Sequence, residues 1–264
     1  MGKYLLGMHR VTTPGELKAL VRRAWKRGTR GLLLSGGFTR DGILPIRPFL
    51  PVVRELKREY GLVVSVHPGL VDRYGAEELR RAGVDIADFE LVLSEEVIRR
   101  VKGLAGKGPH DYIESLEALH RYGPPYLAPH IPLGLEWGRI ASEYEALGVV
   151  RDVDPYVTVV LVYRPTPGTP MSNVPPPDVS NVTEFFREAR RRLRGELSLG
   201  CMRPHSLKAV LDPLLVEQSL IDRIAVPYSN LRQKLGVYEA CCSVPREYLD
   251  LFLKRPFERG IKGD

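Results

Sequence analysis

Residues 31–37 read GLLLSGG, a short apolar run that ends in two adjacent glycines. An amphipathic stretch, Glu16–Arg27, precedes the run, and a second one, Pro48–Tyr60, follows it after a loop. A short apolar run between amphipathic stretches is typical of a strand–helix unit whose strand is covered on both faces. The segment therefore predicts a buried parallel strand over 31–35, and its carboxyl end is formed by Ser35, Gly36 and Gly37.

The same alternation runs along the rest of the chain and predicts seven parallel strands. They are expected at 31–35, 62–67, 85–91, 126–131, 156–163, 197–201 and 223–226. Helices are expected at 16–27, 48–60, 76–82, 111–122, 140–147, 182–194, 206–219 and 230–235, with a short helix capped by Ser94. Strands that alternate with helices indicate an α/β protein built on a parallel sheet.

Seven strands leave two architectures open. An open doubly wound sheet accommodates seven, whereas an eight-stranded barrel of the TIM type needs one more strand to close. Tyr238–Cys242 is a weak candidate for the eighth, and the chain opens on a loop and a helix. We predict a parallel (β/α) barrel over residues 1–245 that is incomplete, followed by a C-terminal helical tail over 246–264.

Composition places the chain among globular proteins. Its 264 residues are 44% hydrophobic and 27% charged, and no run approaches the roughly 20 apolar residues of a membrane span. The N-terminus has no secretory pattern, and three cysteines are too few for a disulfide framework. We expect a cytoplasmic protein with no membrane association. Asn and Gln are scarce while Arg, Glu and Pro are plentiful, which is typical of thermophiles.

The net charge of +7 raises the question of a nucleic-acid partner. The basic residues lie on amphipathic segments such as Glu16–Arg27 and Glu184–Arg194, and no stacking aromatic motif accompanies them. This pattern favours solvated helix faces. We therefore expect no nucleic-acid partner.

Polar side chains gather where the predicted strands end. These ends carry Ser35-Gly36-Gly37, His67, Asp88 with Glu90, His130, and Cys201-Met202-Arg203. Functional groups of parallel α/β folds collect at the carboxyl ends of the strands. Each residue alone could serve a turn or a buried hydrogen bond, but the set together favours a site.

The order of these motifs resembles that of radical SAM enzymes. Leu34-Ser35-Gly36-Gly37 is similar to their glycine motif for S-adenosylmethionine (SAM). Three further segments are similar to biotin-synthase-like members, or to the archaeal lipoyl synthase type: Asp111-Tyr112 with Ser115, Leu116 and Leu119; Pro129-His130-Ile131 through Gly134; and the PTPGTP loop at 165–170. The resemblance covers about residues 2–244.

The resemblance implies a site for SAM and a reaction class. The backbone of Ser35, Gly36 and Gly37 would hold the methionyl amino group of SAM. Glu90 or Asp88 would bind the ribose, and Gly134 with neighbouring residues, His130 among them, would lie near the adenine. The implied chemistry is SAM-dependent radical chemistry, sulfur insertion included, on a small-molecule or protein-bound acyl substrate. No residue of this chain is assigned a catalytic role.

One departure from the family pattern decides what this polypeptide can do alone. Radical SAM enzymes hold a 4Fe-4S cluster on three cysteines, commonly spaced CxxxCxxC, after their first strand, and this sequence has no such triplet. That first strand is missing as well. We expect the chain alone to be inactive and to gain a cluster only if an upstream segment supplies the cysteines. Either the start was assigned too late, or this homologue dispensed with the cluster.

Other interpretations stay open at this point. Cys201, Cys241 and Cys242 could be buried hydrophobes, or ligands of an auxiliary cluster or a redox centre. The chain could also be a cluster-free homologue that binds SAM or partners a second, complete radical SAM subunit. A third reading is a metal-dependent barrel enzyme that uses His67, His130 and Glu90.

Overall fold

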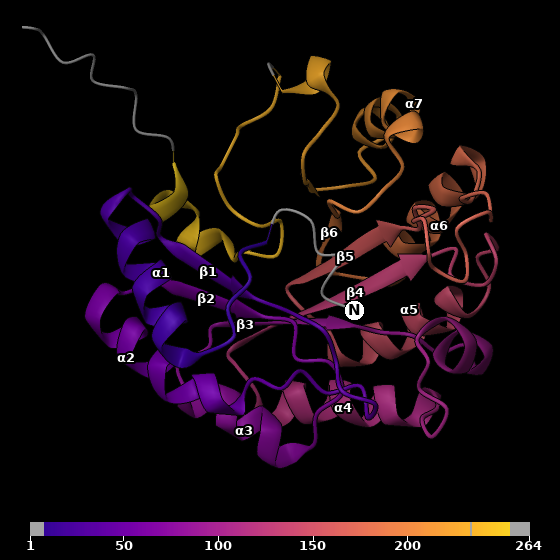
Figure 1. The fold of residues 1–264 in the computed structure, drawn as a ribbon. Helices are drawn as coiled ribbons and strands as arrows, with labels where there is room; N and C mark the ends of the chain where they lie inside the picture. Colours follow the sequence, from indigo (N-terminus) through magenta and orange to yellow (C-terminus); the bar gives the residue numbers. More distant parts are fainter. Residues whose placement is uncertain (1–7, 233, 254–264) are drawn as a thin grey trace, which may run out of the picture.

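A computed structural model describes residues 8–232 and 234–253, and within them the chain forms one curled parallel sheet with helices on its outer side (Figure 1). The strands are β1 (Gly31–Leu34), β2 (Val63–Val66), β3 (Ile86–Glu90), β4 (Tyr126–Leu133), β5 (Val157–Val162), β6 (Glu196–Leu199) and β7 (Arg223–Ile224). They pair in sequence order, and β1 and β7 form the two edges of this sheet. The predicted incomplete (β/α) barrel is confirmed, and the seven predicted strands are the seven observed.

Among the described residues, α1 (Pro14–Lys26) precedes the first strand, and six α-helices connect the seven strands: α2 (Leu50–Tyr60), α3 (Arg73–Arg81), α4 (Pro109–Tyr122), α5 (Ser142–Val153), α6 (Val179–Arg192) and α7 (His205–Glu217). The sequence explains where they begin. In α1, for example, Thr13 and Glu16 form a capping box around Pro14, which suits the first helical position. No helix of the described residues is long and apolar enough to cross a membrane.

Side chains of β2–β5 alternate between two cores. Val64, Ala87 and Phe89 point outward into the large core beneath the helices, whereas Val63 and Ile86 point into the barrel. The inner residues pack on Val244, Leu249 and Phe252 of the C-terminal segment. That segment, which we define as residues 238–253, therefore closes the amino-terminal mouth of the barrel.

Two predictions near the end of the chain were wrong. Tyr238–Cys242 is not a strand: only Tyr238 forms a bridge, with Leu253. The predicted helix at 230–235 is a single 3-10 turn, Ser229–Leu231. Side chains bind the backbone at the end of this segment and just beyond it: Arg223 binds the carbonyls of Cys242 and Val244, and Tyr156 binds that of Ser243. These carbonyls consequently need no strand partner.

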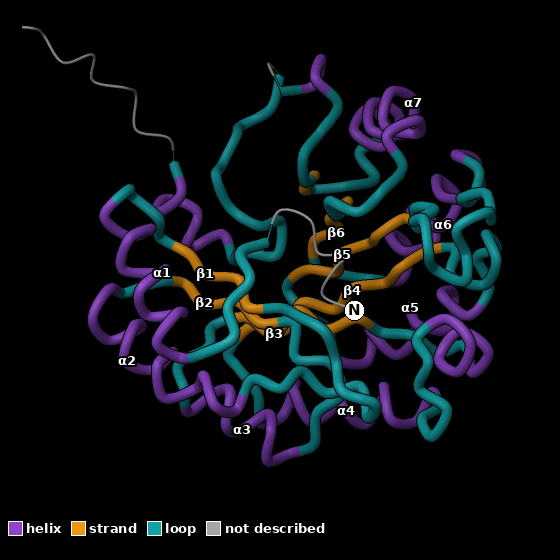
Figure 2. Tube along the Cα trace, in the orientation of Figure 1, coloured by secondary structure: helices purple, strands orange, loops and turns teal. Residues whose placement is uncertain are grey.

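The remaining elements differ from prediction mainly at their ends. The Ser94 helix is a π-helical turn, Val97–Val101, and the predicted tail begins as a 3-10 helix, Arg246–Phe252. The loops between β7 and the 3-10 helix Arg246–Phe252 cross the side of the barrel that α1–α6 leave open (Figure 2). Residues 254–264 of the predicted tail, and the first seven residues, lie outside the described residues.

Candidate SAM and interior sites

The glycine end of β1 presents unused backbone groups. Ser35, Gly36 and Gly37 are half-buried, and within the described residues their amides and carbonyls form no hydrogen bond. They line a groove of about 910 Å³ along the free edge of β1, together with Leu17 and Leu20 of α1 and with residues 8–12. An accessible backbone without side chains offers carbonyls to an ammonium group and amides to a carboxylate.

The loop after β1 is held in place by the loop after β2. Leu44 donates a backbone hydrogen bond to the carbonyl of Pro68, at 2.9 Å, and Ile43 bridges to Gly69. Gly69 has φ +70°, and a Cβ there would lie 2.1 Å from the carbonyl oxygen of Gly42. Only glycine permits this contact. The glycine end of β1 is thus anchored through a close backbone approach that the sequence pattern did not reveal.

Four side chains form a charged cluster at the rim of β2, β3 and β4. Glu90 and His130 are register partners in neighbouring strands, and the rings of His67 and His130 meet edge to face with centroids 5.2 Å apart. Lys102 places its Nζ 2.5 Å from both carboxylate oxygens of Glu90. The structure therefore brings three predicted residues together and adds a lysine.

Sequence reasoning missed Lys102. It follows the π-helical turn, twelve residues after Glu90, and no motif surrounds it. The available signal for Lys102 was a basic residue in the segment that follows a strand ending in a glutamate. That pattern is too common to identify a site.

Burial and neighbouring charges set the protonation of this cluster. Burial acts to raise the pKa of Glu90, but the charge and hydrogen bonds of Lys102 oppose it, and the net effect is a lowered pKa. Burial lowers the pKa of His130, and the nearby Asp88 carboxylate only partly opposes that shift. Glu90 is therefore ionised at neutral pH and His130 is neutral. The contact of His130 Nδ1 with the carbonyl of Ala128, at 2.9 Å, makes Nδ1 the protonated nitrogen.

Asp88 lies one layer deeper than Glu90. Residues two apart share a strand face, so both point into the barrel, but Asp88 is only 1% exposed. Its Oδ2 accepts a hydrogen bond from Ser65, and its Oδ1 has no partner among the described residues. Of the two predicted ribose ligands, Glu90 is the one placed at the rim.

Gly134 is buried in packing contacts. A Cβ at this residue would lie 2.4 Å from Cγ of Pro177, and its amide donates to Oε1 of Glu143 at 2.8 Å. This glycine therefore lets the loop before α6 pack closely on the end of β4. Its predicted place beside the adenine stays a prediction.

Arg203 is locked inside the fold. Its guanidinium binds both carboxylate oxygens of Asp212 at 2.8 Å, and both side chains are 0% exposed. It also donates to the carbonyls of Gly200, Ala225 and Val226. This predicted rim arginine thus fastens the ends of β6 and β7.

The cysteines are spread over the barrel. Cys201 is exposed at the end of β6, and Cys241 and Cys242 lie in the C-terminal segment. Among the described residues, no group of three or more His, Cys, Asp or Glu side chains could hold a metal ion. These residues consequently do not fit a 4Fe-4S cluster, and His67, His130 and Glu90 are not arranged as metal ligands.

Only solved structures are similar to this chain among the known proteins compared with it. No family model and no curated protein matches the chain. Among solved structures, HydG, a maturase of the FeFe-hydrogenase, is similar with a TM-score of 0.59 and 14% identity, over 83% of this chain and 50% of HydG. Methylornithine synthase (PylB) has a TM-score of 0.57 and 16% identity, over 90% of this chain and 68% of PylB.

SuiB from Streptococcus suis, solved bound to SAM, has a TM-score of 0.55 and 14% identity over 76% of this chain and 46% of SuiB. These neighbours are radical SAM enzymes, and the likeness establishes a shared fold. This chain spans about half the length of HydG and SuiB and about two thirds of PylB.

Proposed function

We propose that this chain, which has the partial barrel fold of radical SAM enzymes, binds SAM across the carboxyl ends of β1–β4. The observation that supports this most directly is the backbone of Ser35, Gly36 and Gly37, which forms no hydrogen bond within residues 8–232 and 234–253 and lies at the rim that also carries Glu90 and His130. β1 and β4 are three strand spacings apart, about 14 Å, so an elongated ligand can contact both.

Each part of the rim suits one part of SAM. The carbonyls of Ser35–Gly37 would accept hydrogen bonds from the methionyl ammonium group, and the ionised Glu90 would accept them from ribose hydroxyls. His130, neutral and with Nδ1–H directed at Ala128, leaves Nε2 as an acceptor. Because these residues do not fit a 4Fe-4S cluster, we assign to them SAM binding and no step of SAM cleavage.

Titration calorimetry tests this proposal. SAM and S-adenosylhomocysteine should both bind saturably to the wild-type chain. Gly36→Val should weaken SAM binding at least tenfold, because a Cβ at Gly36 already lies 3.2 Å from Cδ1 of Leu44 and two further methyl groups would crowd the backbone that SAM has to approach. Gly106→Val is the matched control, since nothing lies within 4 Å of a Cβ there. Absence of saturable binding, or equal affinities for SAM in the two variants, would overturn the proposal.

Two finer proposals rest on motif resemblance and on the open sheet. The biotin-synthase-like motifs support radical chemistry on a small-molecule or protein-bound acyl substrate, sulfur insertion included, in a cytoplasmic enzyme whose cluster ligands come from outside these residues. The free edge of β1 supports pairing with a second radical SAM subunit. The reduced chain alone should form no 5′-deoxyadenosine from SAM, and it should form it when a cysteine-bearing segment or subunit is present.

A further inference from the structure

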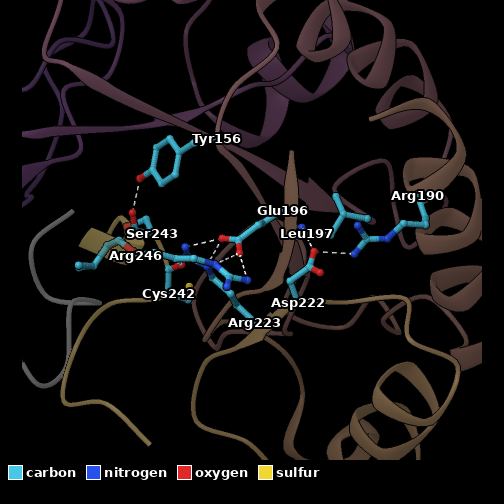
Figure 3. A network of polar contacts seen from close by, with 10 residues as sticks. Tyr156, Arg190, Glu196, Leu197, Asp222, Arg223, Cys242, Ser243 and Arg246 are labelled. Carbon is cyan, nitrogen blue, oxygen red and sulfur yellow. Dashed lines mark hydrogen bonds and ion pairs between the residues drawn. The ribbon is translucent and has the colours of Figure 1, made fainter. Parts of the chain in front are cut away.

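The C-terminal segment carries two neighbouring thiols, Cys241 and Cys242, into the amino-terminal mouth of the barrel. Side chains from the strands hold it there (Figure 3): Tyr156 binds the carbonyl of Ser243, and Arg223 donates to that of Cys242 at 3.3 Å. Glu196 in turn binds Arg223 and Arg246. The thiols are therefore fixed at the end of the barrel opposite to Ser35–Gly37.

Cys241 opens into a cavity of about 350 Å³ between this segment and the start of β1. The walls include Leu33 and Ser65 of the barrel interior and the ring of Phe252. Arg27 and Arg30 also line the cavity, against one carboxylate, Glu239. The thiol is thus accessible to a small molecule, and the cavity carries a net positive charge that favours an anionic one.

Neighbouring groups stabilise the thiolate form of Cys241. The hydroxyl of Ser243 donates to Sγ of Cys241 at 3.3 Å, and the neighbouring thiol of Cys242 also favours the thiolate. Cys242 is the larger influence, and together the two groups lower the pKa of Cys241 to about 6 against the opposing effects of burial and Asp88. Tyr156, the residue before β5, is neutral, because burial raises its pKa. An accessible thiolate of this kind is a nucleophile.

We propose that Cys241 is a site of reversible S-thiolation by small anionic disulfides. The thiolate of Cys241 attacks one sulfur of the disulfide R–S–S–R, a new S–S bond forms, and the old one breaks. The second sulfur leaves with the bonding electron pair as RS⁻, so the exchange needs no further oxidant. A second exchange with a free thiol reverses it.

The mixed disulfide should persist because Cys242 is badly placed to displace it. Neighbouring Cα atoms are 3.8 Å apart, shorter than the roughly 4.4–6.8 Å of ordinary disulfides. A disulfide between Cys241 and Cys242 is consequently disfavoured. This inference is independent of SAM binding.

Disulfides of opposite charge test the proposal. The dianionic 5,5′-dithiobis(2-nitrobenzoate) should modify Cys241 first, at pH 6.5 and low salt, faster than it modifies Cys201. Arg27→Gln with Arg30→Gln should slow this reaction several-fold and should leave the reaction with cationic cystamine unchanged or faster. Mass spectrometry locates the adduct and counts one per chain.

Variants of Cys241 and its neighbours show whether the fast reaction is due to a stabilised thiolate or only to the exposure of the thiol. Cys241→Ser should abolish the fast phase, and Cys201→Ser should keep it. Cys242→Ala and Ser243→Ala should each slow it about three- to tenfold, whereas Cys242→Ser, which keeps a donor, should slow it less. A fast phase that survives Cys241→Ser would overturn the proposal, and so would arginine substitutions that change the rates with the anionic and the cationic disulfide by the same factor.

Discussion

At the scale of one residue, Arg203 is a polar side chain at a strand end that stabilises the fold through a buried ion pair. Its pair with Asp212 is fully buried, and removing one partner leaves an uncompensated charge. We expect Arg203→Met to lower the free energy of unfolding by about 3–5 kcal/mol, measured by urea denaturation. The double variant Arg203→Met, Asp212→Leu should recover much of that loss. A loss below about 1 kcal/mol in the single variant would contradict the buried pair.

His130 predicts a pH dependence of stability. Its pKa in the folded chain is below the ordinary 6.5, so the unfolded chain takes up a proton first as the pH falls. The stabilisation from neutral His130 is complete above about pH 6.5 and is lost as the pH falls from there towards the folded pKa. His130→Asn should therefore lose less stability than wild type between pH 7.5 and 5.5. His110→Asn, at an exposed helix position, should behave like wild type.

At the scale of elements, the contact between the loops after β1 and β2 decides the shape of the glycine end. Gly69→Ala must adopt a left-handed backbone and also meets the carbonyl of Gly42, whereas Gly61→Ala has the same backbone cost with nothing within 4 Å. We expect Gly61→Ala to cost about 1–2 kcal/mol of stability and to leave SAM affinity unchanged. Gly69→Ala should cost more and should also weaken SAM binding in calorimetry. Equal SAM affinities would show that the loop contact does not position the site.

At the scale of the whole molecule, the sheet has a centre and two edges. β4 and β5 are paired on both sides, while β1 and β7 are each paired on one. Hydrogen exchange should therefore be slowest in β4 and β5 and faster by orders of magnitude in β1 and β7. Protection of β1 equal to that of β4 would mean that its edge is covered in solution. Repeating the hydrogen exchange of β1 at different salt and protein concentrations would then distinguish self-association of the chain from local stability of the strand.

Prediction of the fold from the sequence succeeded where a local pattern was sufficient. Short apolar runs such as Leu62–His67 and amphipathic stretches such as Asp111–Tyr122 carry their own periodicity, so element type and order follow from neighbouring residues. The prediction of a strand over Tyr238–Cys242 was wrong, and the end of that segment is held by a residue far away in sequence, because Arg223 binds the carbonyl of Cys242. Of the site, the strand-end residues were predictable, and Lys102 was not.

The sequence by itself determined the alternation of strands and helices, the glycine end Ser35–Gly37 and the lack of a CxxxCxxC triplet, because each is a property of residues near one another in the chain. The tertiary structure alone decided that Glu90 pairs with Lys102 beside His130, that Arg203 is buried, and that Cys241 faces the opposite end of the barrel. These outcomes depend on strand register and on long-range burial. Both are set by the packing of segments far apart in the chain, which no local pattern encodes.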